Sequence, residues 1–134
     1  MIAYIARKTK NTPTYIVQKV GEKELGKVLD LADIYHSDNI DRVSDDIIEA
    51  ATIELGDFDN ITTARYSIPS YRDIGKVYKR LILRVAKEKN IEIIDALMEV
   101  YQSFLVEKIE NYNGSYYYEA PQNMLVDYMS GKLE

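Results

Sequence analysis

Residues 70–111 read SYRDIGKVYKRLILRVAKEKNIEIIDALMEVYQSFLVEKIEN and carry the clearest helical pattern in the chain. The pattern opens with Ser70 and Asp73, a serine-x-x-acid pair of the kind that caps the first turn of a helix. Apolar residues then recur every three or four positions, at Ile74, Val77, Tyr78, Leu81 and Val85. We therefore predict an amphipathic helix over residues 70–89.

A second helix is predicted over residues 91–111. Its apolar residues also follow the helical period, and they are Ile94, Leu97, Met98, Tyr101, Leu105 and Ile109. Only Lys89 and Asn90 join it to the first helix, and such a short joint favours an antiparallel helical hairpin. We expect the helix pair 70–89/91–111 to form the centre of the fold, because two apolar stripes can bury each other there.

The N-terminal region is rich in β-branched and aromatic residues. Residues 2–8 and 13–20 predict two β-strands, joined by a hairpin loop at residues 10–13, with Pro13 at the start of the second strand. The expected fold class is therefore α+β and predominantly α. In this fold an N-terminal β-hairpin, or a small antiparallel sheet, packs on a helical bundle centred on the antiparallel helix pair.

Shorter patterns predict the remaining elements. They are helices over residues 22–35, from Ser44 to Gly56 and from Pro121 onward, and weak strands over residues 61–68 and 115–118. No internal repeat, low-complexity tract or linker is visible in the sequence. The sequence therefore favours a single domain over residues 1–134.

The 134-residue chain has no cysteine and a single histidine, His36, which restricts the chemistry open to it. Disulfides, thiolate metal sites and cysteine nucleophiles are excluded, and a zinc site would need three carboxylate ligands. The acidic runs at 45–46 and 57–60 lack the spacing of a calcium-binding loop. We expect no catalytic residue, no metal and no cofactor, and hence a protein that is not an enzyme.

The composition also bears on location and origin. No stretch approaches the roughly 18 apolar residues of a membrane span, and the chain does not start with a signal-like apolar segment. Together with the absence of cysteine, this favours a cytoplasmic protein without a membrane partner. Abundant Ile, Lys, Asn, Asp and Tyr are typical of AT-rich genomes, including those of phages and plasmids that carry small proteins.

Charge is unevenly distributed along the chain, although the net charge is only −5. Residues 65–89 carry eight basic and two acidic groups, whereas residues 22–62 carry twelve acidic and three basic groups. The predicted helix over residues 70–89 presents most of the positive charge on one face. The residues of this face are Arg72, Lys76, Lys79, Arg80, Arg84 and Lys87.

This basic face has three interpretations. It can be solvated and paired with the acidic segment 22–62 of the same chain, it can bind an anionic protein partner, or it can follow the phosphates of a nucleic acid. The net negative charge argues against simple non-specific DNA binding, and no helix-turn-helix pattern precedes the helix.

Three adjacent tyrosines, Tyr116, Tyr117 and Tyr118, are the second distinctive feature. In a strand the three side chains cannot all face the core, so at least one is expected at the surface. An exposed tyrosine is a good anchor in a protein interface and can also stack on a base. The alternative is two buried rings whose hydroxyl groups reach the surface.

The leading hypothesis from these features is a small regulatory or inhibitory interaction protein, carried by a phage or plasmid, that binds a larger host protein or nucleoprotein. The alternative is a nucleic-acid-binding protein that uses the basic face of helix 70–89, either alone or as a homodimer. An enzyme that relies on carboxylates and tyrosines alone has no support in the spacing of these residues.

Overall fold

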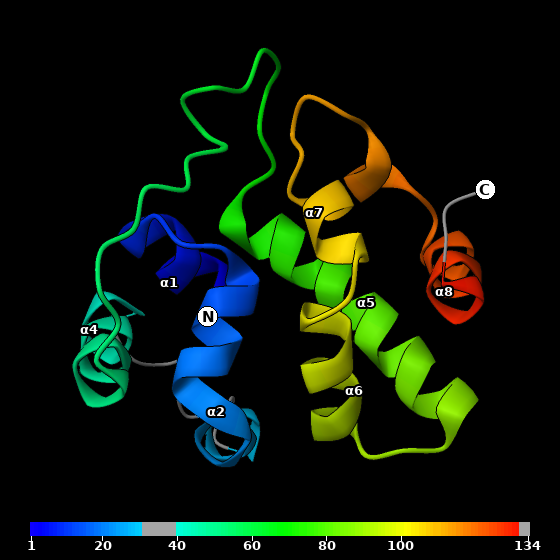
Figure 1. The fold of residues 1–134 in the computed structure, drawn as a ribbon, viewed down its shortest axis with the longest axis horizontal. Helices are drawn as coiled ribbons and strands as arrows, with labels where there is room; N and C mark the ends of the chain where they lie inside the picture. The colour runs from blue at the N-terminus through cyan, green and yellow to red at the C-terminus, as the bar shows by residue number, and fades with distance from the viewer. Residues whose placement is uncertain (31–39, 132–134) are drawn as a thin grey trace. The chain divides into compact units, whose positions relative to one another are not determined.

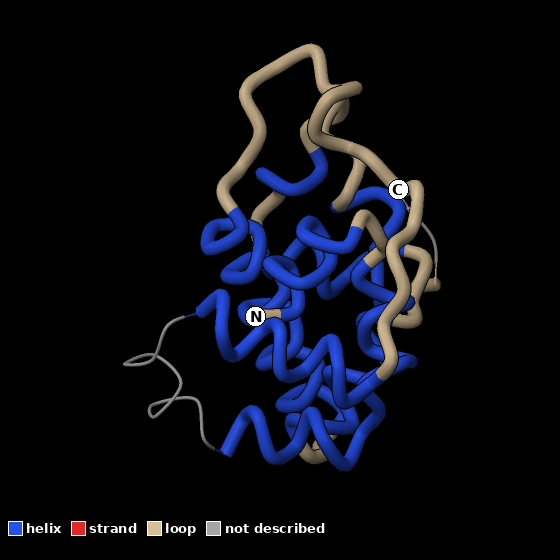
Figure 2. Tube along the Cα trace, turned by 90° about the vertical axis from the view of Figure 1, so that its left-hand side faces the viewer, coloured by secondary structure: helices blue, strands red, loops and turns tan. Residues whose placement is uncertain are grey.

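The structure, a computed structural model, describes residues 1–30 and 40–131. Over these ranges it consists of helices, turns and loops, without any β-strand (Figure 1, Figure 2). The chain divides into two compact units, Met1–Phe58 and Asp59–Glu134, each with its own helices. No helix in the described ranges is both long enough and apolar enough to cross a membrane.

The described residues of the first unit form three helices, α1 (Ile2–Thr9), α2 (Pro13–Asp30) and α4 (Ile40–Ala51). Each of the three contacts the other two. A small hydrophobic core lies among them, and its buried residues are Ile5, Ala6, Ile16 and Ile53. Partly buried side chains of α4, among them Ile47 and Ile48, pack against this core.

The β-hairpin predicted at the N-terminus is wrong, and so is the α+β class, because the residues of both predicted strands lie in α1 and α2. β-Branched side chains favour strands only weakly, and here burial along one helical face outweighs that preference. In α1 the buried residues are Ala3, Ile5, Ala6 and Thr9, which share one face of a helix. In α2, before Gly21, the buried residues Pro13, Ile16 and Val17 follow the same period.

The turn between α1 and α2 contains residues that are typical of helix ends, although strands were predicted on both sides of it. α1 ends at Thr9, and Lys10 after it takes the left-handed backbone conformation with a φ of 56°. The backbone N–H of Tyr15 donates to Thr12 Oγ1 at 3.2 Å, so Thr12 caps the first turn of α2. Pro13 follows as the first helical residue, where its missing N–H costs no helical hydrogen bond.

The helix predicted over residues 22–35 is confirmed as far as Asp30, where it forms the second part of α2. The two parts of α2 meet at Gly21, whose φ of 83° lies outside the helical region and suits a residue without a Cβ atom. Residues 31–35, and His36 after them, lie outside the described residues.

α4 begins earlier than the sequence predicts, at Ile40 rather than at Ser44. Ser44 is buried inside the helix, where its hydroxyl donates to the carbonyl oxygen of Asp41 at 2.9 Å and accepts from Lys8 Nζ at 3.2 Å. A serine that bonds back to the preceding turn is tolerated in a helix interior. The helix ends at Ala51, before the predicted stop at Gly56.

The last segment of the first unit folds back on the end of α1. The backbone N–H of Gly56 donates to the Thr9 carbonyl at 2.8 Å, and that of Phe58 donates to the Lys10 carbonyl at 2.9 Å. A Cβ atom on Gly56 would overlap with the Lys10 carbonyl oxygen and with the side chain of Asn11. This close approach therefore requires glycine.

The described residues of the second unit form α5 (Tyr71–Lys89), α6 (Ile93–Tyr101), α7 (Leu105–Ile109) and α8 (Pro121–Ser130), with a 3₁₀ turn, η1 (Tyr116–Tyr118). α5 is the longest of these helices, and it contacts both α6 and α8 (Figure 1). The predicted cap of α5 is confirmed, because the N–H of Asp73 donates to Ser70 Oγ at 3.1 Å. Its predicted apolar stripe is also in the core, with Ile74, Tyr78, Leu81 and Val85 buried.

The helix predicted over residues 91–111 is divided into α6 and α7 by residues 102–104. Ser103 makes the break, because its N–H bonds to the Val100 carbonyl at 3.1 Å and its hydroxyl donates to the same oxygen at 2.7 Å. The apolar residues on both sides of the break are nevertheless buried, as the sequence predicts for Leu97, Tyr101, Leu105 and Ile109.

The two weak strands predicted in the second unit are wrong. Residues 61–68 form a loop of turns and bends, and residues 115–118 lead into and form η1. The predicted start of the last helix is confirmed, since Pro121 opens α8. Met124 and Leu125 are buried and hold α8 against the unit.

Candidate functional site

The six basic residues singled out in the sequence lie along one face of α5. Successive residues of an α-helix are rotated by about 100°, which places the six within an arc of about 140° and over a length of about 22 Å. We call this face the basic stripe, and it consists of Arg72, Lys76, Lys79, Arg80, Arg84 and Lys87. Five of these side chains are exposed, and Arg84 is partly buried.

The opposite face of α5 fixes the direction of the basic stripe. Ile74, Leu81 and Val85 are each 0% exposed, on the side of α5 that packs into the second unit. A rotation of α5 that hid the stripe would expose these side chains, at about 1.5–3 kcal/mol each. The hydrophobic core therefore holds the stripe at the surface.

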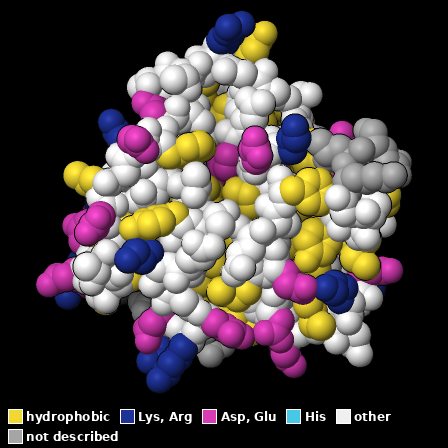
Figure 3. Space-filling view, in the orientation of Figure 1, with side chains coloured by type: hydrophobic (Ala, Val, Ile, Leu, Met, Phe, Trp, Pro, Cys, Tyr) yellow, Lys and Arg dark blue, Asp and Glu magenta, His cyan; other side chains and the backbone are white. Residues whose placement is uncertain are grey.

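The acidic groups that the structure describes in the second unit do not pair with the basic stripe. Within residues 59–131, none of its six cations forms an ion pair with a carboxylate. Arg84 donates to the Arg80 carbonyl at 3.1 Å, and Arg72 lies over the Tyr71 ring, 5.9 Å from its centroid. On the face shown in Figure 3, acidic and basic side chains are interspersed.

Lys89, which lies just beyond the stripe, does form an ion pair within this unit. Its Nζ lies 2.6 Å from Glu99 Oε1 of α6, and this hydrogen bond raises the pKa of Lys89 above its ordinary value. The cations of the stripe have no such partner among residues 59–131. Pairing of the stripe with the acidic segment 22–62 stays a prediction.

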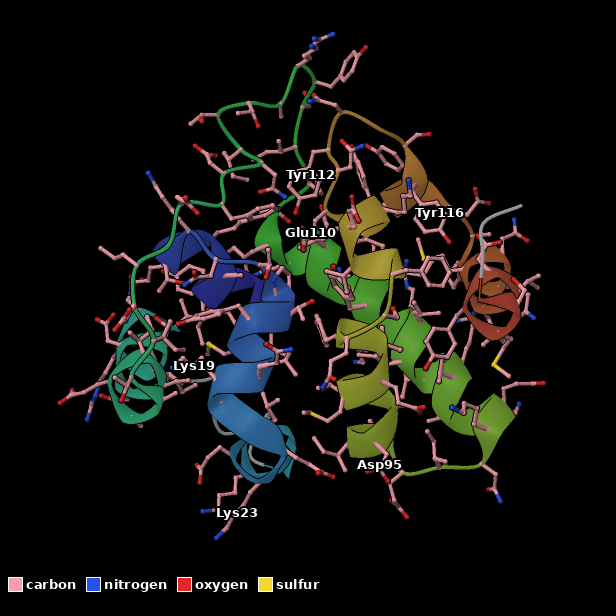
Figure 4. The ribbon with its side chains drawn as sticks, viewed as in Figure 1. Lys19, Lys23, Asp95, Glu110, Tyr112 and Tyr116 are labelled. Carbon is pink, nitrogen blue, oxygen red and sulfur yellow. The ribbon has the colours of Figure 1, made fainter. Side chains whose placement is uncertain are left out.

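The three adjacent tyrosines lie in η1, and only one of them is exposed. Tyr116 donates its hydroxyl to Asp127 Oδ2 at 2.7 Å, which ties the turn to α8 (Figure 4). Burial, followed by this hydrogen bond, raises the pKa of Tyr116. Tyr117 is buried and meets the Tyr112 ring edge-on, at a centroid distance of 5.6 Å. Tyr118 is 78% exposed, so it alone offers a ring to a partner.

The end of α7 holds a buried carboxylate that the sequence pattern does not reveal. Glu110 is only 7% exposed, and it accepts hydrogen bonds from the hydroxyls of Tyr78 at 3.1 Å and Tyr112 at 2.8 Å. The side-chain amide of Asn60 donates to the Glu110 carbonyl at 2.8 Å and lies 3.2 Å from Oε2. Figure 4 shows Glu110 and Tyr112 close together beside α7. We call these four residues the Glu110 cluster.

The Glu110 cluster continues into the core through stacked phenol rings. Tyr78 and Tyr101 lie with ring centroids 4.5 Å apart. Burial, followed by the negative charge of Glu110, raises the pKa of both tyrosines. The hydroxyl of a buried tyrosine needs a hydrogen-bond partner. Tyr78 and Tyr101 in the predicted apolar stripes were therefore the sequence signal for a buried polar group in this region.

The acidic runs noted in the sequence have local structural roles. Asp45 Oδ1 lies 2.7 Å from Lys8 Nζ and connects α4 to α1. Asp59 Oδ1 accepts the backbone N–H groups of Ile61 and Thr62, each at 2.9 Å, and closes a turn. Among the residues that the structure describes, no three His, Cys, Asp or Glu side chains group closely enough to hold a metal ion.

The basic stripe is therefore the strongest candidate for a binding surface in the second unit, and the exposed ring of Tyr118 is a smaller one. The Glu110 cluster connects the loop at residue 60 to α5 and α7, and its carboxylate lies inside the unit. No protein-family model, curated protein or solved structure matches this chain.

Proposed function

We propose that this chain is a small non-enzymatic regulatory protein that binds a larger host protein through the basic stripe and thereby inhibits or regulates it. The supporting observation is six cations on one face of α5 without an acidic partner among the described residues 59–131. Like charges four residues apart on a helix repel by about 0.2–0.5 kcal/mol per pair, and an anionic partner relieves this repulsion on binding.

The proposal includes a cytoplasmic location and a phage or plasmid origin. A chain without cysteine suits a reducing compartment, in which disulfides do not form. The abundance of Ile, Lys and Asn suits an AT-rich mobile element.

A protein partner suits the overall charge better than a nucleic acid does. The second unit carries ten basic and eleven acidic residues, a net charge of −1, and the whole chain carries −5. A polyanion that extends beyond the stripe would meet this acidic remainder and be repelled by it. A protein can present acidic groups to the stripe alone, so the partner is expected to carry a local acidic surface.

Affinity capture with matched charge-reversal variants tests this proposal. Lys76→Glu/Arg80→Glu reverses two exposed cations of the stripe, and Lys19→Glu/Lys23→Glu reverses two exposed cations of α2 with the same change in net charge (Figure 4). We expect wild type and the α2 variant to retain one host protein, and the stripe variant to lose about tenfold or more of its affinity. Equal retention by both variants contradicts the proposal.

Nucleic-acid binding is the second candidate, and one observation before α5 favours it. Tyr66 is 68% exposed and follows Arg65 in the loop that leads to α5, a pairing of ring and cation that suits stacking on a single-stranded base. This candidate predicts salt-dependent binding that is lost when Arg72, Arg80 and Arg84 become glutamate. A flat gel-shift titration at low salt dismisses it.

A further inference from the structure

One exposed apolar side chain, Leu83, lies among the cations of the basic stripe. It is 43% exposed, and its neighbours three and four positions away on the helix surface include Lys79, Arg80 and Lys87. The methylene stems of these long side chains can lie against a leucine while their charged ends point outward. The surface therefore has an apolar centre and a cationic rim.

Together with Leu83, the basic stripe forms two parallel rows of side chains with four-residue spacing. One row is cationic throughout and consists of Arg72, Lys76, Arg80 and Arg84. The other consists of Lys79, Leu83 and Lys87. Four residues of an α-helix rise by about 6 Å, so each row presents a side chain about every 6 Å. Rows of this kind are the ridges that fit into the grooves of a second helix.

We infer that the basic stripe recognises an acidic amphipathic helix of the partner protein, with Leu83 as the apolar contact. This inference rests on the proposed function. Glutamates four positions apart on such a helix repeat at the same interval of about 6 Å as the cationic row. Apolar residues beside them meet Leu83, which gives the apolar centre and charged rim of a protein interface.

A nucleic acid would contact only part of this surface. Phosphates can pair with the cationic row, but they offer no apolar surface to Leu83. In duplex DNA the apolar groups open to a side chain are the thymine methyls, which lie inside the major groove. The second row, with Leu83 between two lysines, therefore favours a polypeptide.

Fluorescence anisotropy with two labelled peptides of identical composition tests the inference. One peptide places glutamate and leucine on adjacent faces of a helix, and the other mixes them around it. A short single-stranded DNA and its duplex are the nucleic-acid probes. We expect wild type to bind the amphipathic peptide about tenfold more tightly than the mixed one, and Leu83→Gln to lose most of that preference and keep only the part that the cationic row provides. Val126→Gln removes an apolar side chain of similar exposure, 45%, from α8 and should leave the preference intact.

Several results overturn the inference. Equal binding of the two peptides by wild type does so, and so does a Leu83→Gln protein that keeps the full preference. Tighter binding of either DNA than of the amphipathic peptide assigns the stripe to nucleic acid instead. No peptide binding at about millimolar concentration excludes helix recognition altogether. The proposed function fails separately, when the stripe variant Lys76→Glu/Arg80→Glu keeps its captured host protein.

Discussion

The two faces of α5 differ in whether their charged groups have partners within the unit. On the buried face, Tyr78 donates to Glu110, and Asn60 completes a set of hydrogen bonds inside the second unit. On the exposed face, the basic stripe has no carboxylate partner among residues 59–131. A buried charge without partners is costly, so it must find them within the fold, whereas an exposed charge remains available to a second molecule. The charged group on the buried face thus stabilises the unit, whereas the cations on the exposed face can bind a partner.

The largest effect on stability is expected from Glu110→Ala. This substitution removes the acceptor of the Tyr78 and Tyr112 hydroxyls and leaves both buried, which should lower the free energy of unfolding by about 2–4 kcal/mol. Urea denaturation followed by circular dichroism measures the change. Glu107→Ala removes an exposed carboxylate from α7 and should change stability by less than about 0.5 kcal/mol. Equal effects of the two substitutions would contradict the distinction between buried and exposed charges.

Alkaline pH is expected to weaken the buried face. Burial raises the pKa of Tyr78 and Tyr101 above the ordinary value of 10.0, so above that pH the unfolded chain loses protons that the folded chain keeps. Their contribution to stability is therefore complete below pH 10 and falls as the pH rises, by up to about 1.4 kcal/mol per pH unit for each tyrosine. Urea titrations on both sides of pH 10 measure this slope. Tyr78→Phe should reduce it, and an unchanged slope would exclude Tyr78 as its source.

The smallest effect, with the opposite sign, is expected on the exposed face. Arg80→Gln removes repulsion with Lys76 and Arg84, so stability should rise by about 0.2–0.5 kcal/mol per pair at low salt. The gain should disappear at high salt, because exposed charges are screened. Arg42→Gln is the matched control, since Arg42 has Asp46 four residues later and its neutralisation should lower stability slightly. A loss of stability in Arg80→Gln would show that Arg80 has a stabilising contact.

Signals at the ends of helices predicted much of the second unit. The Ser70 cap, the Pro121 start and the apolar period of α5 each act within one or two turns, so a local pattern reveals them. Thr12 and Pro13 carry the same kind of signal in the first unit. The first unit was nevertheless predicted as strands, because residues 2–8 and 13–20 are rich in β-branched side chains. The buried residues of α1 and α2 follow a helical period.

Contacts between distant residues explain what the sequence could not predict. Asn60 and Glu110 are 50 residues apart, and no local period connects them. The six residues of the basic stripe share one helical face, so their common direction could be predicted from spacing alone. The spacing could not predict which cation pairs with a carboxylate, because the pairing of Lys89 with Glu99 depends on how α6 packs beside α5.

The hydrogen bonds of Gly56 and Phe58 determine how the first unit would carry a mechanical load. Tension applied to the chain beyond Phe58 falls first on these two bonds to the end of α1, and reaches the buried Ile53 only after they break. α1 thus shields the small core from a pull along the chain. An added methyl group at position 56 would remove that protection at its source, because the segment could no longer lie against the Lys10 carbonyl.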